Sequence, residues 1–138
     1  MGGDCWAQRG PYREDLEAAF REMQARELER RGIPGTIEEL WHDEDWIEEI
    51  MTGGTASVLD QAEFAGPGGP DGAACLRPLS DAEVRAWAPG GRPTAAEWEA
   101  ALDSDALDYP MRSAARCTVL YDERGEPAEI GYWGVTAD

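Results

Sequence analysis

The segment CTVLYDERGEPAEIGYWGV, residues 117–135, carries the clearest strand signal in the chain. Side chains of residues 117–121 alternate between two faces, which is the period of a β-strand. Residues 122–127 follow as a turn, in which Gly125 is free to take a positive φ. Alternation resumes over residues 128–133. The segment therefore predicts an antiparallel hairpin at the centre of a sheet, and the other elements are placed around it.

Four helices are predicted before the hairpin. The first is expected over residues 12–31, where apolar residues recur at helical spacing. The other three begin where Ser or Thr is followed three residues later by Glu, the arrangement of a capping box. These starts are Thr36, Ser80 and Thr94, and the helix that starts at Thr36 is predicted to continue to Met51.

Two more strands complete the predicted sheet. They are expected at residues 55–60 and 74–79, on either side of a Gly/Pro-rich loop at residues 61–73. Residues 1–10 are predicted to be loosely ordered. The sequence thus predicts a single α+β domain over residues 1–138, with a roughly four-stranded, mostly antiparallel sheet and about four helices packed on one side of it.

The net charge of the chain indicates which kinds of binding partner are disfavoured. The formal net charge is −17, and residues 32–76 carry ten acidic side chains and no Lys or Arg. A surface of this sign disfavours nucleic acids and anionic membranes, which need basic residues to displace counterions. No apolar run reaches the roughly 18 residues of a membrane span, and no signal peptide is visible at the N-terminus. A cytoplasmic location is therefore expected.

The most acidic stretch is EELWHDEDWIEEI, residues 38–50, which contains the single histidine of the chain and seven carboxylates. On a continuous helix, Glu38, His42, Asp45 and Glu49 form a row about 16 Å long, opposite a broad apolar arc. Such a row suits contact with a basic surface.

Trp46 allows two interpretations of this stretch. If the helix is continuous, Trp46 lies beside the row and outside the apolar arc, where an exposed indole among carboxylates is a typical anchor for a protein partner. If the helix breaks near Asp43, that residue caps a second helix and Trp46 becomes part of its buried stripe. The partner-binding residues predicted from the first interpretation are Glu38, His42, Asp45, Trp46 and Glu49.

Catalytic signatures are lacking. One histidine limits both Ser-His-Asp and Cys-His arrangements, and no G-x-S-x-G or P-loop pattern occurs. The three cysteines form no C-x-x-C pair, so a zinc knuckle is not indicated. We expect no cofactor and no resident metal. The alternative is a metal-dependent enzyme or small-ligand-binding domain that uses His42 and its neighbouring carboxylates.

Four segments carry a resemblance to known sequences. GGTASVLD (53–60), LRPLSDAEVRAW (76–87), RPTAAEWEAAL (92–102) and VLYDERGEPAEIGYWG (119–134) resemble a family of small acidic actinobacterial proteins of uncharacterised function. That family has G-T-x-S-V-L-D in the first motif, often with His as the variable residue, and V-x-Y-D-x-x-G-x-P in the hairpin. Ala56 stands at the histidine position here. The resemblance implies a shared fold over about residues 36–135 and supplies no activity.

Acidity, small size and the lack of a catalytic signature together favour a non-enzymatic protein that binds a basic protein partner. An immunity protein that neutralises a basic toxin is one such protein, since carboxylates would complement the toxin's basic cleft. Mimicry of DNA is less favoured, because residues 1–31 carry seven acidic and six basic side chains and are close to neutral.

Overall fold

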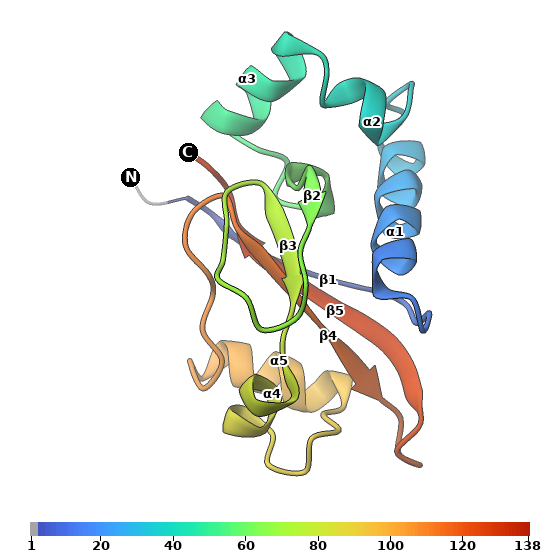
Figure 1. Ribbon diagram of the computed structural model, residues 1–138, viewed down its shortest axis with the longest axis vertical. Helices are drawn as coiled ribbons and strands as arrows, with labels where there is room; N and C mark the ends of the chain where they lie inside the picture. Colours follow the sequence, from blue (N-terminus) through green and yellow to red (C-terminus); the bar gives the residue numbers. More distant parts are fainter. Residues whose placement is uncertain (1–2) are drawn as a thin grey trace.

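The predicted hairpin forms the middle of a five-stranded sheet, as the computed structural model of the protein shows for residues 3–138 (Figure 1). Strands β4 (Ala115–Tyr121) and β5 (Pro127–Val135) pair antiparallel. Gly125 lies in the turn between them with a φ of 77°, so the predicted turn is confirmed.

The sheet is mixed rather than mostly antiparallel, and its strand order is β1-β5-β4-β3-β2. β1 pairs antiparallel with β5, whereas β3 pairs parallel with β4 and β2 pairs parallel with β3. The α+β class is confirmed, but the sheet has one strand more than predicted. The remaining strands are β1 (Cys5–Pro11), β2 (Glu63–Phe64) and β3 (Cys75–Pro78).

β1 corrects the prediction that residues 1–10 are loosely ordered. It is an edge strand paired with β5 along its whole length, from Cys5 opposite Val135 to Pro11 opposite Glu129. Residues 1 and 2 lie outside the described part of the chain. Pro11 belongs to this strand, so the following helix begins later than predicted, where Asp15 caps it by accepting a hydrogen bond from the Ala18 N–H.

Residues 3–138 contain five α-helices, because the predicted helix from Thr36 to Met51 is divided in two. Capping boxes at Thr36, Ser80 and Thr94 are all confirmed. The helices are α1 (Leu16–Arg31), α2 (Ile37–Leu40), α3 (Glu44–Thr52), α4 (Asp81–Trp87) and α5 (Ala95–Asp103).

Both faces of the sheet are covered, which differs from the one-sided packing predicted. On one face, Ile130 and Tyr132 of β5 pack with Phe20 of α1. On the other, Trp133 packs with Trp98 of α5, their ring centroids 6.0 Å apart. This division follows from the side-chain alternation of β5. In Figure 1, α2 and α3 cross the end of the molecule opposite α4 and α5.

Residues 55–60 do not form the predicted strand. After Ala56, which takes a φ of 55°, Val58–Asp60 forms a single 3₁₀ turn, η1. Side chains of Ser57 and Asp60 accept hydrogen bonds from nearby backbone N–H groups, which removes the donors that a strand would use in a ladder. Strand β3 was predicted correctly, and β2 lies inside the predicted Gly/Pro-rich loop.

Candidate functional site

The acidic stretch folds as two short helices joined at Asp43. Thr36 and Glu39 cap α2, and the Asp43 carboxylate accepts a hydrogen bond of 2.9 Å from the Asp45 N–H to cap α3. The interpretation with a break near Asp43 is therefore the correct one. The continuous row of Glu38, His42, Asp45 and Glu49 does not exist as one helix face, because His42 lies in the turn between the helices.

Trp46 is buried, with 8% of its surface exposed. It packs in a third apolar cluster with Leu28 of α1, Ile50 of α3 and Leu59 of η1. The prediction of Trp46 as an exposed anchor is therefore wrong, since its side chain attaches α3 to the rest of the molecule. Met51, near the end of the same helix, lies 38% exposed.

Seven carboxylates remain on the outside of α2, α3 and their connection, and we call this set the acidic surface. All seven residues are exposed, and so is His42. None forms an ion pair with any residue in the described part of the chain. The acidic surface consists of Glu38, Glu39, Asp43, Glu44, Asp45, Glu48 and Glu49.

Arg77 and Arg116 are engaged with carboxylates outside the acidic surface. Arg77 is almost fully buried and bonds to Asp71 and Glu83, while Arg116 bonds to the same Asp71 at 2.7 Å. Partial burial alone would raise the pKa of Asp71, but the hydrogen bonds and charges of the two arginines outweigh it and lower that pKa. These pairs are internal to the fold, so they leave the acidic surface without compensation.

A cavity of 370 Å³ lies beside the acidic surface, between α1 and α2. Its apolar lining includes Leu28, Ile33 and Ile37, and its charged lining consists of Arg21, Glu29 and Glu38. The Arg21 guanidinium donates hydrogen bonds to the Gln24 side chain and the Ala62 carbonyl. Glu38 therefore belongs both to the cavity and to the acidic surface. A ligand that combines an apolar group with positive charge would match both features.

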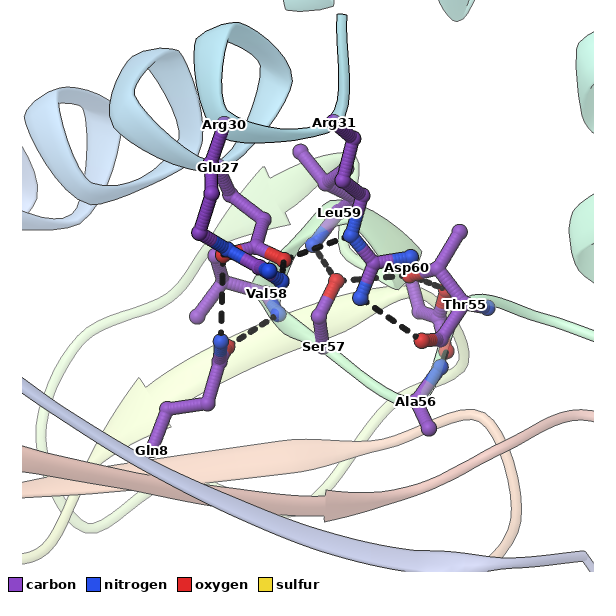
Figure 2. A network of polar contacts seen from close by, with 10 residues as sticks. All are labelled: Gln8, Glu27, Arg30, Arg31, Thr55, Ala56, Ser57, Val58, Leu59 and Asp60. Atoms are coloured by element: carbon purple, nitrogen blue, oxygen red, sulfur yellow. Dashed lines mark hydrogen bonds and ion pairs between the residues drawn. The ribbon is translucent and has the colours of Figure 1, made fainter.

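The motif at residues 55–60 supports this end of the molecule through a closed polar network (Figure 2). The buried Asp60 carboxylate accepts hydrogen bonds from the Thr55 N–H and hydroxyl, each at 2.7 Å, and from the Ala56 N–H at 3.2 Å. Burial raises the pKa of Asp60, and these three donors oppose the shift. Ser57 is buried and its hydroxyl lies 2.6 Å from that of Thr55, so the motif presents no free nucleophile.

The same network joins the motif to α1 and β1. Arg31 donates to the Thr55 carbonyl at 3.1 Å and also bonds to Glu27, which Arg30 contacts as well. The hydrogen bond from Arg30 is the main cause of a lowered pKa at Glu27, against the opposing effect of burial. Gln8 of β1 accepts from the Val58 N–H at 3.0 Å. The network therefore fixes the base from which α2 and α3 project.

Sequence reasoning did not identify Asp60, Arg31 or Gln8 as members of this network. Asp60 and Ser57 could have been found, because Thr, Ser and Asp within six residues commonly cap turns rather than extend strands. The bonds from Arg31 to the Thr55 carbonyl and from the Val58 N–H to Gln8 could not be found, because these partners are 24 and 50 residues apart in sequence. Ala56, which takes a positive φ in this motif, is exposed and has no side-chain polar group.

No group of three or more His, Cys, Asp or Glu side chains that could hold a metal ion occurs among residues 3–138. Within the same range, no helix has the length and apolar character required to cross a membrane.

Comparison with protein-family models, with curated proteins and with solved structures finds no match in any of the three. The candidate site is thus defined by its geometry: an exposed acidic surface beside an apolar cavity, on a rigid base.

Proposed function

We propose that this protein binds a basic protein partner through the acidic surface and the adjoining cavity, in the manner of an immunity or inhibitor protein that neutralises a toxin. The observation that carries the proposal is the set of seven exposed carboxylates, none of which has an ion pair within the described part of the chain. Unpaired charges at this density create a local potential that steers an oppositely charged protein towards the surface.

The cavity beside the acidic surface supplies the apolar contact that charge alone does not provide. Binding energy in protein interfaces is concentrated where an apolar group enters a desolvated pocket, with charged residues around it. Leu28, Ile33 and Ile37 offer that pocket, and Glu38 lies at the boundary between it and the acidic surface. A basic partner with one projecting aliphatic or aromatic side chain fits this arrangement. Trp46 is not a contact residue in the proposal, because it is buried beneath the surface.

The alternative function, a metal-dependent enzyme or small-ligand-binding domain centred on His42, has no supporting observation. His42 is exposed in the turn between α2 and α3, and no second element brings three potential ligands together within residues 3–138.

The test compares the native protein with a variant that lacks three charges of the acidic surface, Glu38→Gln, Asp45→Asn and Glu49→Gln. Each protein is immobilised, and extract of the source cells is passed over it at low salt. A matched control removes three exposed carboxylates elsewhere, Glu14→Gln, Glu123→Gln and Glu126→Gln, and so has the same net charge.

We expect the native and control proteins to retain one basic protein in stoichiometric amount, and the acidic-surface variant to retain at least tenfold less. Retention should fall as salt rises, because exposed charges are screened within about 10 Å at 0.1 M. Equal retention by the native protein and the acidic-surface variant, or retention of no basic protein, would exclude the proposal.

A further inference from the structure

The open edge of β1 differs from the other edge of the sheet. β2, at the far edge, has two residues, whereas β1 has seven. An exposed edge of this length presents a row of backbone donors and acceptors that can pair with another strand. β1 ends at Pro11, and nothing in the described part of the chain pairs with its outer side.

The register identifies the free backbone groups. The Thr136 N–H donates to the Asp4 carbonyl at 2.9 Å, and Asp4 is opposite Thr136 when the β1–β5 register is extended by one residue. Because antiparallel pairs alternate, the even-numbered residues of β1 bond to β5. Cys5, Ala7 and Arg9 therefore point their N–H and C=O groups outward.

A second cavity, of 340 Å³, lies against this edge on the side of α5. Ala7 and Arg9 form its β1 wall, Trp98 and Leu102 are its apolar lining, and Tyr109 lies at its margin. The side chain of Ala7 belongs to the α5 face, because Ala7 is opposite Trp133, which packs on α5. A strand added to β1 would place the residue opposite Ala7 on that same face, over the cavity.

The charge at the cavity is acidic. Glu99 and Asp103 of α5 line it, and Asp103 has no ion pair among the residues described. Arg9 lies 3.5 Å from Glu99 and 3.3 Å from Glu129, so its charge is shared between two carboxylates. The apolar lining of the cavity, with a carboxylate at its margin, suits a Lys or Arg side chain. The aliphatic part of such a side chain can pack on the apolar lining while its charged end stays near the carboxylate and water.

We propose that the open edge of β1 binds an extended segment of a protein partner by β-strand addition, with a Lys or Arg of that segment in the cavity between β1 and α5. Main-chain pairing with Cys5, Ala7 and Arg9 supplies affinity, and the cavity selects the basic side chain. This site does not involve the acidic surface on α2 and α3, so its failure would leave the proposed function standing.

The probe is a capped, fluorescein-labelled peptide, Thr-Val-Thr-Lys-Thr-Val-Thr, with a second peptide in which Glu replaces Lys. Binding to the full-length protein is measured by fluorescence anisotropy. Amide hydrogen exchange, followed by NMR, reports which backbone groups become paired. The protein variants are Ala7→Pro, which removes an outward N–H that the fold does not use, and Asp103→Asn, with the exposed Glu123→Gln as the matched control.

We expect the Lys peptide to bind the native protein and the Glu123→Gln variant equally. Binding should be at least tenfold weaker with Ala7→Pro and about two- to fivefold weaker with Asp103→Asn, within the range for one exposed charge pair. The Glu peptide should bind at least tenfold more weakly than the Lys peptide. The amides of Ala7 and Arg9 should gain protection on binding, while those of Trp6 and Gln8 are protected throughout.

Three outcomes would overturn the proposal. One is a Lys peptide that does not bind or leaves the Ala7 and Arg9 amides unprotected. Another is equal affinity for a correctly folded Ala7→Pro variant, which would place the peptide elsewhere. The third is a free protein that is a dimer by light scattering with these amides already protected, because a second copy would then occupy the edge. Far-UV circular dichroism verifies that each variant is folded, and the amide measurement on the native protein does not depend on any variant.

Discussion

Replacing Trp46 by Ala should cost about 3–5 kcal/mol of unfolding free energy, the range for removal of a buried Trp. Trp46 is the largest buried side chain of the third apolar cluster and is 8% exposed. A Trp side chain buries about 200 Å², and at about 25 cal/mol per Å² this corresponds to about 5 kcal/mol, of which Ala retains a part. Trp46→Phe should cost less, because it keeps most of the apolar contact and removes an indole N–H that is buried without a partner in the described structure.

Urea denaturation followed by circular dichroism at 222 nm measures this change without relying on tryptophan fluorescence. Met51→Ala is the matched control, because it lies on the same helix, is 38% exposed and should change stability by less than about 0.5 kcal/mol. If Trp46→Ala cost no more than Met51→Ala, Trp46 would have to be exposed. The break at Asp43 and the third cluster would then both be wrong.

Two further predictions concern the polar network and the sheet. The raised pKa of Asp60 means that native stability relative to Asp60→Asn should increase as pH falls from 7 to 4. The pKa of Asp71 is lowered, so native stability relative to Asp71→Asn should stay nearly constant down to about pH 4 and decrease below it. Equal slopes for the two comparisons, in denaturation followed from pH 7 to about pH 2, would contradict both predictions. Gly131→Ala should cost about 1–3 kcal/mol, because its Cβ would lie 2.8 Å from Trp98 Cε2. Gly90→Ala, whose Cβ would meet nothing within 4 Å, should be neutral, and thermal unfolding of both glycine variants measures the difference.

The sequence predicted those parts of the fold that depend on near neighbours. The hairpin of β4 and β5 has a turn with one glycine and strands that alternate, so its pairing is local. The three capping boxes each involve residues three apart. Such signals act within one turn of chain, and the structure contains all of them.

Long-range pairing could not be predicted in the same way. β1 is a strand because β5, more than 100 residues later, supplies its hydrogen bonds, and nothing in CWAQRGP alternates clearly enough to indicate this. The parallel pairs of β2, β3 and β4 likewise depend on crossover connections, whose positions are decided by packing on the two faces. Local sequence patterns therefore could not predict the number of strands or the mixture of parallel and antiparallel pairs.

At the candidate site, the charge was predictable and the geometry was not. The helical wheel assumed that residues 37–51 form one helix, and on that assumption Trp46 lies outside the apolar arc. The assumption fails at Asp43, because the Asp43 carboxylate caps a new helix. Residues after Asp43 therefore follow the axis of α3 and do not continue the faces of α2. Glu44 and Glu48, which would have lain on the apolar arc of a continuous helix, are both exposed.

The break at Asp43 also reduces the cost of concentrating seven carboxylates on so short a stretch. A helix N-terminus carries partial positive charge and stabilises acidic residues in its first turn by about 0.3–1 kcal/mol each. One continuous helix would offer this to Glu38 and Glu39 alone, whereas the second N-terminus adds Glu44 and Asp45. Four of the seven carboxylates are thus stabilised by the partial positive charge of a helix N-terminus and not by an arginine. The same turn that buries Trp46 therefore creates the second helix start, which stabilises Glu44 and Asp45 although neither has an ion pair among residues 3–138.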